Sequence, residues 1–94
     1  MKDVTDKVVL VTGGSKGLGR QLAARFARVG AKVVLWARTQ ADLDRAVDEF
    51  RCEGWQAWAH SVDVTDIDRV MEAAAQVKED VGPVDVLVNN AGFV

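Results

Sequence analysis

The stretch that decides the fold is KVVLVTGGSKGLG, residues 7–19. Its first half, residues 7–12, is a nearly continuous, β-branched apolar run, which is typical of a strand buried on both faces. Its second half, residues 13–19, is rich in glycine and predicts a tight turn. An amphipathic helix is predicted next, over residues 18–29, because apolar side chains recur there at spacings of four, four and three: Leu18, Leu22, Phe26 and Val29.

The rest of the chain repeats this alternation of strand and helix. Further strands are predicted at residues 32–37, 55–62 and 84–88, and further helices at residues 40–52 and 65–81. Alternating elements of this length indicate parallel strands joined by right-handed crossovers. The predicted fold class is therefore α/β, with a doubly wound parallel sheet in a single domain spanning residues 1–94.

The start and the buried face of the last helix can also be predicted. Thr65 with Asp68 three residues later resembles a capping box, with Asp in place of the usual Glu or Gln. The expected apolar stripe of this helix consists of Ile67, Val70, Met71, Ala74 and Val77 or Val81.

Composition excludes several classes of function. Lys and Arg number 12 against 14 Asp and Glu, a net charge of −2, which argues against a nucleic-acid or anionic-membrane partner. The single cysteine, Cys52, cannot form an intrachain disulfide and favours a reducing, cytoplasmic location. With only one histidine, His60, a Cys/His zinc site is excluded by count, and no metal site is expected. No apolar run reaches the roughly 18 residues of a membrane span.

The glycine-rich turn lies where a doubly wound fold binds phosphate, after the first strand and at the N-terminus of the first helix. Glycines there let the backbone turn sharply and approach a pyrophosphate closely. The helix offers free N–H groups and the positive end of its dipole to the anion. The alternative interpretation is a strand–helix turn that binds no ligand.

Two well-known phosphate motifs do not fit this turn. Gly14 and Gly19 have the spacing of a P-loop, but Arg20 and Gln21 follow where Lys and a Ser/Thr hydroxyl belong. The G-x-G-x-x-G pattern can be started at Gly17, but its sixth position, which must be glycine, is then Leu22. The pattern that remains is T-G-x-x-x-G-x-G, with a wider first spacing.

The chain resembles the short-chain dehydrogenase/reductase family at three places. Residues 12–19 (TGGSKGLG) are similar to its TGxxxGxG cofactor loop, and residues 89–92 (NNAG) to its NNAG motif. Between them, residues 63–64 (DV) look like its adenine-side pair. Residues 19–23 and 33–39 are also similar to members that act on retinoids and other lipid-like carbonyls.

The resemblance implies a set of binding residues for a nicotinamide dinucleotide. Asp63 would accept a hydrogen bond from the adenine amino group, Val64 would meet the ring through its backbone, and Asn90 would lie along the ribose and nicotinamide. The alternatives are a helix-entry carboxylate near Thr65 for Asp63, and a strand-end hydrogen-bond clamp for Asn89 and Asn90. The pyrophosphate and adenosine ribose would be wrapped by Gly13, Ser15, Lys16, Gly17, Leu18 and Gly19.

Charge at the end of the second strand favours NADP(H) over NAD(H). An NAD site usually has an acid there for the ribose hydroxyls, and Ala37 stands at that place. Arg38, Lys16 and Thr39 suit a 2′-phosphate instead. The alternative is that Arg38 is a solvated surface charge. The nearest acid, Asp42, is expected to be a surface residue of the next helix.

No catalytic residue is predicted. In the family a Ser, a Tyr and a Lys of the C-terminal half carry the chemistry, and this sequence contains no tyrosine. The sequence therefore predicts the cofactor-binding half of an NADP(H)-dependent enzyme that interconverts a carbonyl and an alcohol. The alternatives are a non-catalytic NADP(H)-binding module or shortened family member, and a structural remnant that binds nothing.

The last strand would leave an apolar sheet edge, which predicts self-association or homo-oligomers.

Overall fold

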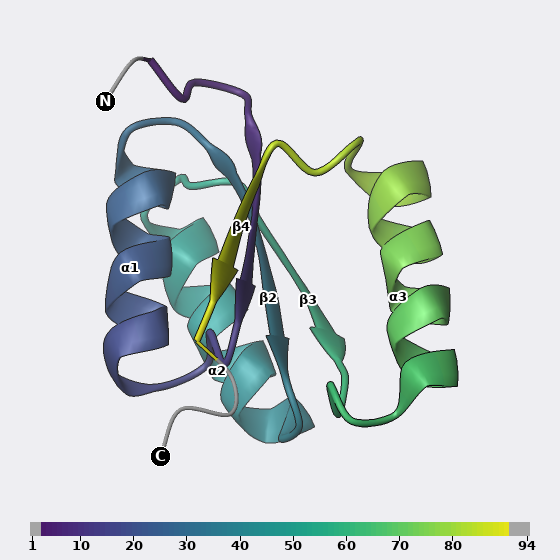
Figure 1. The fold of residues 1–94 in the computed structure, drawn as a ribbon. Helices are drawn as coiled ribbons and strands as arrows, with labels where there is room; N and C mark the ends of the chain where they lie inside the picture. The colour runs from purple at the N-terminus through teal and green to yellow at the C-terminus, as the bar shows by residue number, and fades with distance from the viewer. Residues whose placement is uncertain (1–2, 91–94) are drawn as a thin grey trace.

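The computed structural model describes residues 3–90 and shows four strands alternating with three helices (Figure 1). The strands are parallel and lie in the order β3-β2-β1-β4. This arrangement confirms the predicted α/β class with a parallel sheet wound on both faces. The elements are β1 (Val8–Thr12), α1 (Gly17–Arg28), β2 (Lys32–Ala37), α2 (Gln40–Cys52), β3 (Ala57–Ser61), α3 (Ile67–Asp80) and β4 (Val86–Asn89).

Two separate cores cover the two faces of the sheet. Alternate strand residues point to opposite faces, so Val9 and Val33 pack on the side of α1 and α2, with Leu43 and Phe50 of α2. The strand residues that alternate with them point to the opposite face of the sheet and pack against α3. The buried cluster on that face comprises Val8, Leu10, Val34, Trp36, Val62, Ala73 and Val77. Figure 1 shows α1 and α2 together on one side of the sheet and α3 on the other.

The buried face of α1 differs from the predicted stripe. The helix buries its small residues Gly19, Ala23 and Ala27, whereas Leu18 is 62% exposed and Val29 is also exposed. Small side chains allow the helix axis to approach the sheet closely. Leu22 and Phe26 of the predicted stripe are half-buried, and Phe26 packs against this core, so the apolar pattern found the border of the buried face and missed the small residues at its centre.

The start and inner face of α3 are also corrected. Ala73 and Val77 are buried, while the predicted Ile67, Met71 and Ala74 are exposed. The cap is neither Thr65 nor a box with Asp68, because Asp66 Oδ1 accepts the N–H of Arg69 at 3.2 Å. The third strand is shorter than the predicted residues 55–62 and covers Ala57–Ser61.

β4 lies at one end of the described sheet and pairs only with β1 there. Its Leu87 is 60% exposed, and Val84 before the strand is exposed as well. The predicted apolar edge is thus present in the structure, while the self-association inferred from it stays a prediction.

A polar contact joins β2 and β3 beside the α3 core. Trp36 and His60 are register partners, and the indole Nε1–H donates to His60 Nδ1 at 3.3 Å. The sequence offered no partner for this histidine. Because Nδ1 accepts, the ring proton of neutral His60 resides on Nε2. Burial, and then the nearby Arg69 cation, lower the pKa of His60 below its ordinary value of 6.5.

His60 should therefore make stability depend on pH. Since its folded pKa lies below its unfolded one, the unfolded chain takes up a proton first as the pH falls through about 6.5. We expect the free energy of unfolding to decline between pH 7.5 and 5.5, as measured by urea titration. In His60→Gln, which cannot titrate, the decline should be smaller. An equal decline in both proteins would contradict this assignment.

Candidate nucleotide-binding site

A cleft of about 410 Å³ opens at the carboxyl ends of β1, β2 and β3. This is the edge at which doubly wound sheets bind ligands. Of the predicted binding residues, Gly17, Leu18, Gly19 and Asn90 do not belong to its lining. The lining consists of Gly13, Ser15, Lys16, Trp36, Ala37, Arg38, Thr39, Val62, Asp63, Val64 and Thr65.

The glycine-rich turn is fixed to β2 by its own backbone. The N–H groups of Gly13 and Gly14 both donate to the carbonyl oxygen of Trp36, at 2.7 and 3.2 Å. Gly13 and Gly17 adopt positive φ values of 67° and 55°, which glycine accepts without strain. A Cβ on Gly19 would lie 2.2 Å from the Gly13 carbonyl oxygen, so only glycine fits there.

The N-terminus of α1 remains available to an anion. Within residues 3–90, the side chain of its N-cap residue, Lys16, makes no capping hydrogen bond, and the first turn holds no acidic residue. At α3, by contrast, Asp66 caps the helix. The N–H groups of its first turn and the positive end of its dipole can therefore bind phosphate oxygens.

The cations predicted to recognise a 2′-phosphate both line the cleft. Arg38 follows Ala37, the last residue of β2, and Ser61 Oγ donates to the Arg38 carbonyl at 3.0 Å, which fixes the backbone there. Lys16 reaches the same cleft from the glycine turn, but its Nζ lies 3.3 Å from Asp42 Oδ2. Asp42, which was expected to be a surface residue, has a side chain only 19% exposed and is paired with this lysine.

Asp63 is a helix-entry carboxylate that also lines the cleft. Its Oδ1 accepts both the backbone N–H and the hydroxyl of Thr65, at 2.9 and 2.7 Å. These two bonds, with a smaller contribution from the Arg38 cation, lower the pKa of Asp63. The carboxylate is therefore ionised, and it faces the cleft beside Val64.

Asn90 takes part in a clamp between β1 and β4. Its backbone N–H donates to Thr12 Oγ1 at 3.0 Å, and that hydroxyl lies 3.1 Å from Asn89 Oδ1. The Asn90 side-chain amide reaches the Gly13 carbonyl at 3.5 Å. The structure thus supports the clamp interpretation of both asparagines. Ala91 and Gly92, the rest of the NNAG motif, lie outside the described residues.

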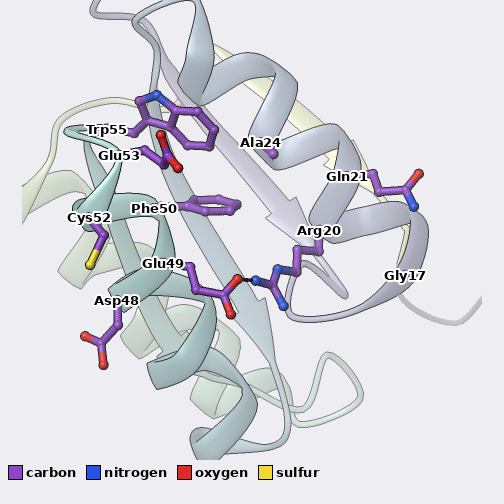
Figure 2. Close-up of a pocket in the computed structure, with 10 residues that line it drawn as sticks. All are labelled: Gly17, Arg20, Gln21, Ala24, Asp48, Glu49, Phe50, Cys52, Glu53 and Trp55. Atoms are coloured by element: carbon purple, nitrogen blue, oxygen red, sulfur yellow. Dashed lines mark ion pairs between the residues drawn. The ribbon is translucent and has the colours of Figure 1, made fainter.

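A second hollow, of about 640 Å³, lies between α1 and α2 (Figure 2). Arg20 extends into it from α1 and forms an ion pair with Glu49 of α2, so this cation is directed away from the nucleotide cleft. Asp48 and Glu53 also border the hollow, which makes it net acidic and unsuited to a pyrophosphate. The nucleotide cleft is the better anion site.

Comparison with known proteins identifies the family. Residues 7–94 match the short chain dehydrogenase family. The chain therefore belongs to the short-chain dehydrogenases. It is 48% identical over 84 residues to gluconate 5-dehydrogenase of Gluconobacter oxydans, a match that covers 89% of this chain and 33% of that protein.

Solved short-chain dehydrogenases share the fold. Actinorhodin polyketide ketoreductase with NADPH superposes with a TM-score of 0.89 at 39% identity, over 93% of this chain and 33% of that one. A metagenomic short-chain oxidoreductase in complex with NADP gives 0.90 at 36% identity, over 98% and 42%. The chain thus spans 33% to 42% of the length of these relatives.

Two features of this short-chain dehydrogenase segment were missed from the sequence. The Lys16–Asp42 ion pair joins residues 26 positions apart, and no local pattern announces it. The clamp of Asn89 and Asn90 was among the expected alternatives, but its partner on β1, Thr12, was not identified, although the threonine of the TGxxxGxG motif was a signal that could have indicated it. Within residues 3–90 the structure shows no group of side chains suited to a metal ion and no helix able to cross a membrane.

The Thr12 clamp predicts a loss of stability on removal of its hydroxyl. Thr12→Val keeps the shape but leaves the Asn90 N–H without its acceptor, which should cost about 1–3 kcal/mol. Thr12→Ser retains the hydroxyl and should cost much less. Urea denaturation of the two variants measures the difference, and a larger loss in Thr12→Ser than in Thr12→Val would show that the methyl group, not the hydroxyl, matters.

Proposed function

We propose that this chain is the NADP(H)-binding part of a short-chain dehydrogenase/reductase that interconverts a carbonyl and an alcohol. The observation that carries the proposal is the cleft at the strand ends, which combines an uncapped helix N-terminus with two cations and no acid at the end of β2. When bound, the nicotinamide supplies the hydride chemistry, and the residues of this chain bind and orient the dinucleotide.

The pyrophosphate would rest on the glycine turn, held by the N-terminus of α1. Gly13 and Ser15 line the cleft directly, while Gly19 allows the helix to begin against the turn. Gly17 and Leu18 supply the first N–H groups of the helix. The fit is supported by the missing side chain at Gly19, where a Cβ would displace the turn.

The adenosine end would occupy the part of the cleft between β2 and β3. Asp63 uses Oδ1 for Thr65, so Oδ2 can accept from the adenine amino group. Val64 adjoins it, and its backbone can meet the ring. Asn90, which closes the clamp near Gly13, would face the ribose on the nicotinamide side.

A preference for NADP(H) follows from the charges around the ribose. Ala37 offers no carboxylate to bind the 2′- and 3′-hydroxyls of NAD. Arg38, with its planar guanidinium, and Lys16 are matched to a phosphate, and Thr39 can add a hydroxyl. Structures with NADPH and with NADP among the similar proteins support the same choice.

Two further properties belong to the proposal. The exposed edge of β4 supports self-association. The free, exposed Cys52 supports a reducing, cytoplasmic location.

Charge reversal at Arg38 tests the cofactor preference. Arg38→Asp should weaken NADPH binding roughly 10- to 100-fold, because a charge-assisted hydrogen bond is lost and a like charge gained. NADH binding should be unchanged or improved. Titration followed by tryptophan fluorescence measures both. Lys7→Asp is the matched control, since it makes the same charge change before β1, at the opposite end of the strands. Equal weakening of NADPH and NADH by Arg38→Asp would refute the charge argument.

A glycine pair tests the pyrophosphate site. Gly17 (φ 55°) and Gly54 (φ 82°) both adopt the left-handed conformation, and a Cβ on either would meet no protein atom within 4 Å. Alanine at either position should cost about 1 kcal/mol of stability. Only Gly17→Ala should weaken dinucleotide binding, for NADPH and NADH alike. Unchanged affinity in that variant would place the pyrophosphate elsewhere.

A further inference from the structure

Of the two cations that line the nucleotide cleft, Lys16 forms an ion pair with a carboxylate, because its Nζ lies 3.3 Å from Asp42 Oδ2. We propose that Asp42 is a specificity-determining residue: by holding Lys16, it limits how strongly the cleft prefers a dinucleotide with a 2′-phosphate. This inference rests on the proposed function, because it concerns the same cleft and the same cofactor.

Asp42 is the fixed partner of the pair. Its side chain is 19% exposed and belongs to the first turn of α2, whereas the Lys16 side chain is 74% exposed on a long flexible stem. Arg45, one turn along the helix, lies 3.8 Å from the other carboxylate oxygen. The lysine therefore takes its position from the carboxylate, and not the reverse.

The pair lies at the phosphate-recognising end of the cleft. Lys16, Arg38 and Thr39 all line it, and α2 begins at the next residue, Gln40, which places Asp42 directly behind this edge. A 2′-phosphate bound by Arg38 would compete with Asp42 for the Lys16 ammonium. Asp42 itself does not belong to the cleft lining, so it would act on a bound phosphate through its hold on Lys16.

The competition affects the two cofactors differently. NADPH can bind Lys16 only if the ammonium leaves Asp42 or is shared with it. The loss of this ion pair offsets part of the attraction between Lys16 and the 2′-phosphate. NADH carries an uncharged hydroxyl at this position and leaves the ion pair intact. Exposed ion pairs have modest strength, which sets the expected size of the effect at about two- to five-fold in affinity.

The experiment is a double-mutant cycle on the whole chain with Asp42→Asn, Lys16→Gln and the combined variant. NADPH and NADH are titrated into each by calorimetry, and thermal unfolding confirms that each variant is folded. Asp42→Asn should tighten NADPH binding about two- to five-fold and leave NADH unchanged. In the Lys16→Gln background the same substitution should have less than half of this effect. Asp48→Asn, which removes the same charge from the same helix, is the control and should leave the ratio of the two affinities unchanged.

Three results would overturn the role of Asp42. Weaker NADPH binding in Asp42→Asn would show that the carboxylate orients Lys16 for the phosphate instead of withholding it. If Asp42→Asn changed the NADPH and NADH affinities equally, the ion pair would not set selectivity. The same would follow if the effect of Asp42→Asn on NADPH affinity were undiminished in the Lys16→Gln background. If the wild-type chain binds neither NADPH nor NADH, the proposed function fails and this inference falls with it.

Discussion

The close approach of Gly19 to the carbonyl of Gly13 is the constraint on which the site depends. Because no side chain separates them, α1 begins directly against the turn that leaves β1. The same turn is held to β2 through the Trp36 carbonyl, and to β4 through Thr12 and Asn90. Three neighbouring strands thus converge on one short loop, so the N-terminus of α1 is oriented before any ligand arrives.

Features encoded locally could be predicted from the sequence. The alternation of β-branched runs with amphipathic segments was sufficient for the parallel α/β fold, since strand burial and helix period are properties of short windows. The glycine spacing likewise located the tight turn between β1 and α1, while phosphate binding by this turn stays a prediction. Arg38 and Asp63 follow the ends of β2 and β3, and both line the cleft because parallel strands end at the same edge of the sheet.

Features that depend on packing could not be predicted. The helices bury alanine and glycine, as at Ala23 and Ala73, and small residues carry little weight in an apolar pattern. Asp66, rather than Thr65, caps α3 because the helix begins at Ile67, so Asp66 occupies the N-cap position, while Thr65 lies one residue earlier and donates its hydroxyl to Asp63. Contacts across the fold, such as Lys16 with Asp42, depend on how α1 and α2 are placed after folding and have no signature along the chain.

Trp36 connects the chemistry of the cleft with the opposite face of the sheet. Its carbonyl oxygen holds the glycine turn, while its indole packs in the α3 core and donates to His60. A dinucleotide bound at the turn, as proposed, and a proton that binds the imidazole would therefore act on the backbone and the side chain of one residue. Thermodynamic linkage requires any influence between them to be mutual: whatever cofactor occupancy does to the proton affinity of His60, protonation must do to cofactor affinity.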